Sequence, residues 1–181
     1  MAKQDIAKAV KRVIINDKRY KKLKKVFQEL PDYNLNVDEI EEELISLHES
    51  RTVRRLRRRL EEPRFIDETV KALLKDQEVR SRITEIRISC VNTSSKLEDA
   101  LVAFKQYVFS EYYSEINSIS TKGERDKVVD SCLRTFNKYL GQIERVSEKC
   151  LLLIEDVDKA AYTLKNTIEA VKLITHKSAT V

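Results

Sequence analysis

Glycine, proline and tryptophan are scarce in this chain. Its 181 residues contain two glycines, two prolines and no tryptophan. A β-sheet protein of this size needs many turns, which are built largely from glycine, proline and small polar residues. The composition therefore argues against a sheet architecture and predicts an all-α fold.

Long apolar runs are also absent from the sequence. A helix that spans a membrane needs about 18 or more consecutive apolar residues. The lysine-rich start lacks the apolar core of a secretory signal peptide. Helices that bind a membrane surface combine basic residues with an apolar face rich in tryptophan or phenylalanine, and no such face accompanies the basic segments here. We expect a soluble, cytoplasmic protein that binds no membrane, located in the host cytoplasm if the chain is viral.

Residues that commonly carry catalysis are few and scattered. His48 and His176 have no neighbours at metal-ligand spacing, and the three cysteines are an odd number without paired spacing. Two glycines cannot build a phosphate-binding loop of the G-x-x-x-x-G-K type. Glu155, Asp156 and Asp158 form an acidic cluster, but their side chains diverge around a helix and predict a solvated face. We expect no enzyme activity, no metal and no cofactor.

A heptad repeat runs through residues 129–175. Spacings of four and three alternate over more than six heptads, and twelve of the fourteen positions are apolar. An isolated helix drifts out of phase over this length, so a strict 3.5-residue period predicts a supercoiled seam against another helix. The seam residues predicted to pack within a hairpin or between subunits are Phe136, Leu140, Ile143, Cys150, Ile154, Val157, Leu164, Ile168 and Val171.

The sequence also indicates where the helical segment with this heptad repeat, the second arm, begins. Thr121 and Glu124 match a capping box, in which a threonine caps the helix and a glutamate follows three residues later. The preceding residues, 117–120, are then a short connector. Two arms of similar length joined by a short connector predict a long antiparallel, coiled-coil-like hairpin over residues 64–181.

The first arm, residues 65–119, has apolar residues spaced by sevens. Residues 90–95 contain several weak helix formers, and Ser95 with Glu98 matches another capping box. The heptad series nevertheless continues through this segment in phase. The sequence therefore leaves open whether the first arm is one helix or two.

Residues 1–62 are predicted to form a separate, basic helical unit. Helices are indicated at 4–15, 18–30 and 37–60 by apolar periodicity and by capping residues. The apolar side chains of these segments suffice for a small three-helix cluster.

Positive charge is concentrated in the first third of the chain. Residues 1–64 contain 17 Lys and Arg against 12 Asp and Glu, whereas residues 65–181 contain 18 of each. Two dense blocks carry this charge, and both are candidate nucleic-acid-binding sites because such side chains neutralise phosphates. The arginine block consists of Arg51, Arg54, Arg55, Arg57, Arg58 and Arg59. The lysine block consists of Lys18, Arg19, Lys21, Lys22, Lys24 and Lys25.

Each block has alternative interpretations. A solvated or ion-paired helix face has the same sequence pattern, with Glu61 and Glu62 next to the arginine block, and so does a surface that binds an acidic protein. Tyr20 lies inside the lysine block and is a candidate for stacking on a base. DNA is favoured over RNA as the nucleic acid.

The favoured hypothesis is a non-catalytic nucleic-acid-binding oligomer, in which basic helices hold phosphate and the hairpin joins subunits or a helical protein partner. In layout the chain resembles phage small terminase subunits, which pair a DNA-binding helical region with a helical oligomerisation hairpin. Helical recombination mediators share a similar layout. The alternative is a structural adaptor or assembly subunit that binds a larger complex through its hairpin.

Overall fold

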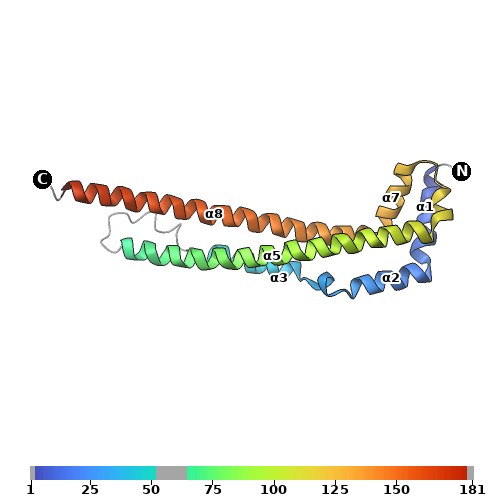
Figure 1. Ribbon diagram of the computed structural model, residues 1–181, viewed down its shortest axis with the longest axis horizontal. Coiled ribbons are helices and arrows are strands. Elements are labelled where there is room, and N and C mark those ends of the chain that lie inside the picture. Colours follow the sequence, from blue (N-terminus) through green and yellow to red (C-terminus); the bar gives the residue numbers. More distant parts are fainter. Residues whose placement is uncertain (1–2, 52–64, 179–181) are drawn as a thin grey trace. The chain divides into compact units, whose positions relative to one another are not determined.

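The computed structural model describes residues 3–51 and 65–178, and every element in these ranges is a helix (Figure 1). This confirms the predicted all-α class. The helices are α1 (Lys3–Asn16), α2 (Lys18–Gln28), the 3-10 helix η1 (Pro31–Asn34), α3 (Val37–Glu49), α5 (Phe65–Glu111), α6 (Tyr113–Asn117), α7 (Lys122–Cys132) and α8 (Arg134–Ser178).

The two longest helices, α5 and α8, pack against each other as the arms of the predicted hairpin (Figure 1). Helix α5 runs without a break through Ser94 and Ser95, so the first arm is one helix. Cys90, Thr93 and Leu97 are all buried along this stretch. Burial of a continuous seam thus outweighs the weak helix propensity of the residues between them.

The second arm begins where predicted but is not a single helix. The Thr121 side chain accepts a hydrogen bond from the backbone N–H of Glu124 at 3.3 Å, as an N-cap does. Helix α7 then ends at Cys132, and α8 starts at Arg134 after a non-helical Leu133. The prediction of one helix from the cap onward was wrong. Helix α7 packs against α1, which gives it a separate partner.

The chain divides into two compact units, and this division differs from the predicted boundary near residue 62. Unit 1 consists of residues Met1–Asn36 and Cys90–Arg145, and unit 2 of Val37–Ser89 and Val146–Val181. Each unit therefore combines an N-terminal segment with parts of both hairpin arms. The N-terminal helices bury their apolar faces against the arms instead of forming a three-helix cluster of their own.

Aromatic side chains form the centre of unit 1. Phe27 of α2 packs against Phe136 of α8 with ring centroids 4.4 Å apart and against Phe104 of α5 at 5.7 Å. Tyr20, one heptad before Phe27, lies 5.7 Å from Phe104. Its hydroxyl donates a hydrogen bond to the carbonyl of Cys132 at 2.7 Å. Two rings spaced seven residues apart thus attach one face of α2 to the rest of the unit.

Aliphatic residues form the core of unit 2. Its most deeply buried side chains include Leu44 of α3, Ile83 of α5 and Val157 of α8, each at most 2% exposed. Leu164 and Ala72 pack together farther along the arms. Three helices thereby contribute to the core of this unit.

The predicted seam of α8 is buried unequally. One of its two heptad series is buried, and it comprises Phe136, Ile143, Cys150, Val157 and Leu164. The remaining predicted residues, Leu140, Ile154, Ile168 and Val171, are only half-buried. Within the chain, therefore, the seam consists mainly of one series. In the parts of the chain that the structure describes, no helix has an apolar stretch long enough to cross a membrane.

Candidate nucleic-acid interface

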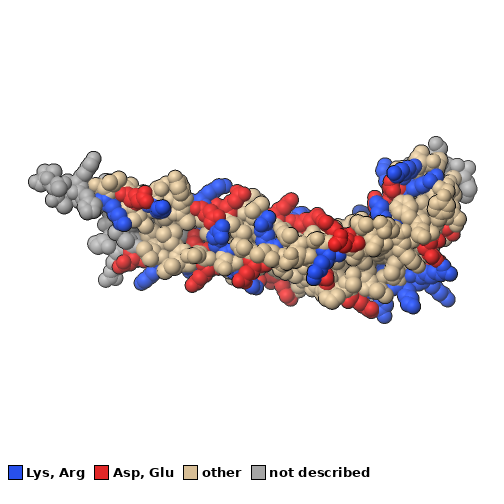
Figure 2. Space-filling model, viewed as in Figure 1, with Lys and Arg blue, Asp and Glu red and all other residues tan. Residues whose placement is uncertain are grey.

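Helix α2 presents a continuous basic face. Asp17 caps the helix by accepting a hydrogen bond from the backbone N–H of Arg19 at 2.6 Å. Because Tyr20 and Phe27 anchor one side, residues spaced by three and four on the opposite side must face outward. These residues are Lys18, Lys21, Lys22 and Lys25, all of them exposed, and we call them the lysine face. Figure 2 shows basic side chains gathered over α2.

Most of the lysine face has no ion-pair partner among the residues that the structure describes. Lys25 forms a loose ion pair, at 3.7 Å, with Glu29, the residue that follows the last turn of α2. Lys18, Lys21 and Lys22 form no ion pair with any residue that the structure describes. Of the two other predicted members of the lysine block, Arg19 pairs with Glu111 and Lys24 is half-buried.

The charge excess belongs to the segment that contains this face. Residues 1–36 contain ten Lys and Arg against four Asp and Glu, whereas residues 37–64 contain seven against eight. The arginine block is therefore balanced by the glutamates and aspartates around it in sequence. The lysine face lies in a region without such a balance.

Arg51 does not belong to an exposed basic face, contrary to the sequence-based prediction. Its side chain is 2% exposed and donates hydrogen bonds to Asp76 at 3.0 and 3.2 Å and to Asp156 at 2.5 Å. Burial alone would lower the pKa of Arg51, but the bonds to the two carboxylates raise it above its ordinary value. Arg51 is therefore committed to an internal ion pair. Arg54, Arg55, Arg57, Arg58 and Arg59 lie outside the described residues.

Tyr20 is not a stacking residue either. It is 2% exposed, and its ring belongs to the aromatic centre of unit 1. Burial raises the pKa of Tyr20 to about 12, with a further contribution from Cys132. A ring held in this way positions α2 and cannot reach a base.

The sequence analysis did not predict the buried ion cluster of Arg51, Asp76 and Asp156. Asp76 lies one heptad before Ile83 in the buried series of α5, so extending that series backward would have placed a carboxylate inside the seam. The acidic cluster of α8 is not simply solvated, because Asp156 binds Arg51 and Asp158 binds Arg80 at 2.7 Å. An aspartate at a seam position with an arginine available elsewhere is the signal that could have found the pair.

Among the described residues, no group of three or more His, Cys, Asp or Glu side chains lies close enough to hold a metal ion. Comparison of the chain with family models, curated proteins and solved structures gave no match. The assignment of function therefore rests on the geometry of the molecule.

Proposed function

We propose that this chain is a non-catalytic nucleic-acid-binding protein whose lysine face contacts the phosphate backbone. One observation carries the proposal: four exposed lysines share one face of a helix that buried rings hold in place. Three of them lack an ion-pair partner among the described residues. The phage DNA-packaging and recombination-mediator classes suggested by the layout both fall within this proposal.

The spacing of the lysines suits a polyanion. Lys18 and Lys25 are seven residues apart, which is about 10 Å along a helix, so the face can reach more than one phosphate of a strand. Each neutralised phosphate releases condensed counterions, and this term favours binding without any base contact. Because Tyr20 and Phe27 already fix the orientation of α2, little ordering of the helix backbone is needed on binding.

The test is a salt titration of DNA binding by the parent and by a variant with Lys18, Lys21, Lys22 and Lys25 changed to glutamate. Binding constants measured by fluorescence anisotropy on a duplex should fall with salt, with a slope of about −0.9 per phosphate contacted. We expect the parent slope to be steeper by about three to four than that of any residual binding by the variant.

A matched control changes the charge equally at another place. Lys71, Lys75, Lys159 and Lys165 are exposed residues of unit 2, and their replacement by glutamate produces the same change in net charge. This control should lose much less affinity than the lysine-face variant. Equal losses would mean that only the net charge matters, and parent-like binding by the lysine-face variant would refute the site.

The second candidate function is a structural adaptor. It is favoured by exposed apolar side chains on the hairpin arms, among them Leu152 and Tyr162 of α8, which are 66% and 68% exposed. An adaptor would be indifferent to DNA and RNA at every salt concentration. The titration described above therefore separates the two candidates.

A further inference from the structure

Helix α5 has a second heptad stripe on its outer side. The stripe consists of Val70, Leu74, Gln77, Ser81, Thr84 and Ile88, with alternating spacings of four and three, and we call it the outer stripe. Its three large apolar side chains, Val70, Leu74 and Ile88, are 46%, 58% and 55% exposed. None of the six residues is charged, although 36% of the whole chain is.

The inner side of α5 is already occupied, so the outer stripe is not part of the core. The buried residues of the same stretch are Thr69, Ala72, Asp76, Val79, Ile83 and Ile86. Arg82, on another side of the helix, binds Glu43 of α3 at 2.6 Å. A third side of the helix that carries no charge over five turns and has large apolar residues at both ends offers a surface on which a further helix can pack.

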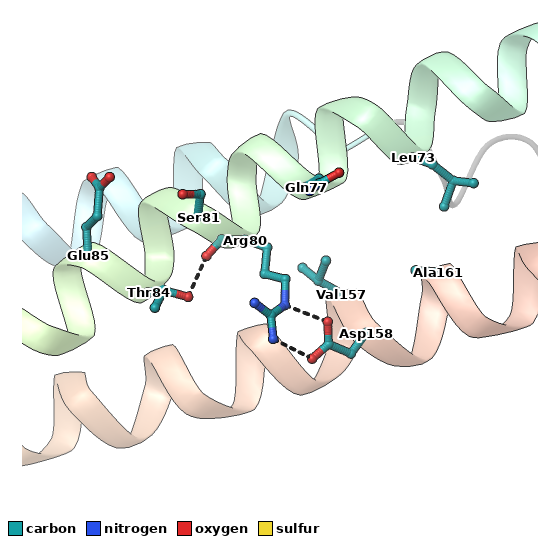
Figure 3. A pocket seen from close by; sticks show the side chains of 9 residues that line it. All are labelled: Leu73, Gln77, Arg80, Ser81, Thr84, Glu85, Val157, Asp158 and Ala161. Carbon is teal, nitrogen blue, oxygen red and sulfur yellow. Dashed lines mark hydrogen bonds and ion pairs between the residues drawn. The ribbon is translucent and has the colours of Figure 1, made fainter.

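A groove runs beside the outer stripe. Gln77, Ser81 and Thr84 line it from α5, and Val157 and Ala161 line it from α8, enclosing about 610 Å³ (Figure 3). The hydroxyl of Thr84 donates a hydrogen bond to the carbonyl of Arg80 at 2.8 Å and therefore needs no other partner. Ser81 and Thr84 are small side chains between the larger residues at the two ends of the stripe, which would let another helix approach closely there.

We propose that the outer stripe is the surface on which a second copy of this chain packs, with the two α5 helices parallel and in register. The flanking charges carry this choice of occupant and orientation. Arg80 and Arg87 flank the stripe on one side, and Glu78 and Glu85 flank it on the other. In a parallel pair, Arg80 of one copy faces Glu85 of the other. An antiparallel pair would instead bring arginine to arginine and glutamate to glutamate.

Arg80 can make this contact without losing its internal partner. Its Nε and one terminal nitrogen bind Asp158 at 2.7 and 3.1 Å, which leaves further N–H donors on the guanidinium (Figure 3). Glu85 accepts a hydrogen bond from Arg82 at 3.1 Å and keeps acceptor capacity. The polar Gln77 would meet its counterpart in a parallel pair, and a polar residue inside a seam fixes register at some loss of affinity.

A second copy would strengthen the binding of nucleic acid, and only this advantage of the dimer rests on the proposed function. Two lysine faces joined through α5 bind one polyanion with higher avidity than one face alone. A two-fold interface also uses the same patch on both subunits, so it closes as a dimer instead of growing into a filament.

Oxidative cross-linking tests the interface and its orientation together. Ser81→Cys should form a disulfide-linked dimer, because a parallel in-register pair brings Ser81 beside its own counterpart, within the Cα separation of about 7 Å that a disulfide tolerates. The control is Ser89→Cys, an exposed position of α5 away from the stripe. The native Cys90, Cys132 and Cys150 are buried and give the background.

Light scattering on the parent and on Ile88→Asp completes the test. Ile88 is 55% exposed, so the substitution should leave helicity unchanged and convert a dimer into a monomer. A monomeric parent overturns the inference, as does equal cross-linking at Ser89. Cross-linking of Ser81→Cys only with Thr84→Cys, in a mixture of the two variants, would show an antiparallel pair and would overturn the proposed orientation.

The outcome is separable from that of the proposed function. The lysine-face variant should retain the Ser81→Cys cross-link, because the two surfaces share no residue. Ile88→Asp should retain salt-dependent DNA binding at reduced affinity. A dimer that ignores DNA would refute the proposed function alone, and a monomer that binds DNA would refute the dimer alone.

Discussion

Arg51 is a buried charge that two aspartates neutralise. Its guanidinium is 2% exposed and depends on Asp76, which is 1% exposed, and on the more accessible Asp156. Moving a charge out of water costs several kcal/mol, which only a well-aligned partner offsets. We therefore predict that Asp76→Ala lowers the free energy of unfolding by about 3–5 kcal/mol, as measured by urea denaturation.

An exposed ion pair provides the comparison for this prediction. Lys159 binds Glu155 at 3.3 Å within α8, and its side chain is 77% exposed. Lys159→Ala should therefore cost less than about 1 kcal/mol. Replacing Arg51 and Asp76 together by leucine should recover most of the lost stability, since no unpaired charge then remains deep in the core. A loss below about 1 kcal/mol in Asp76→Ala would mean that the buried pair contributes little.

At the level of elements, the two heptad series of α8 should differ in energy. Leu164 is 3% exposed and packs on Ala72, whereas Ile168, four residues later, is half-buried. Truncation of a buried leucine removes transfer free energy and leaves a cavity. We predict a loss of about 2–5 kcal/mol for Leu164→Ala and clearly less for Ile168→Ala, both measured by denaturant unfolding. Equal losses would show that both series are buried alike.

The helices could be predicted from the sequence more fully than their contacts. Scarce glycine and proline and a 3.5-residue period suffice for the long arms, and the cap at Thr121 was legible from four residues. The break at Leu133 was hidden because Val129, Leu133 and Phe136 keep the heptad phase across it. The docking of α2 depends on Phe27 meeting Phe104 and Phe136, which lie far apart in sequence, and no local pattern encodes that pairing.

The candidate site, like the fold, could be predicted from the sequence only in part. The charge of the lysine block was visible in the sequence, but exposure separated its members only in the structure. Tyr20 lies between basic residues and looked available, yet its spacing of seven from Phe27 belongs to an apolar face. Arg51 looked like the first member of an arginine block, whereas its partners, Asp76 and Asp156, come from two distant helices.

At the scale of the whole molecule, we expect one buried thiol and two buried phenol groups to lower the stability of the fold at alkaline pH. Burial raises the pKa of Cys132 from its ordinary 9.0 to about 11, and it raises the pKa of Tyr20 and of Tyr112 from 10.0 to about 12. Each group holds its proton more tightly when folded, so the unfolded chain releases protons first as the pH rises. The stabilisation is therefore complete below about pH 9 and is lost progressively between about pH 9 and 12.

Unfolding experiments at a series of pH values should show this decline, and one variant should change its shape. Tyr20→Phe removes the hydroxyl that donates to the Cys132 carbonyl, so it should cost about 1 kcal/mol at pH 7. The same variant no longer contains that buried ionisable group, so its stability should fall less steeply above pH 10 than that of the parent. Tyr162→Phe, at a position 68% exposed, should follow the parent curve throughout. A parent whose stability is constant from pH 9 to 12 would contradict the burial of these groups.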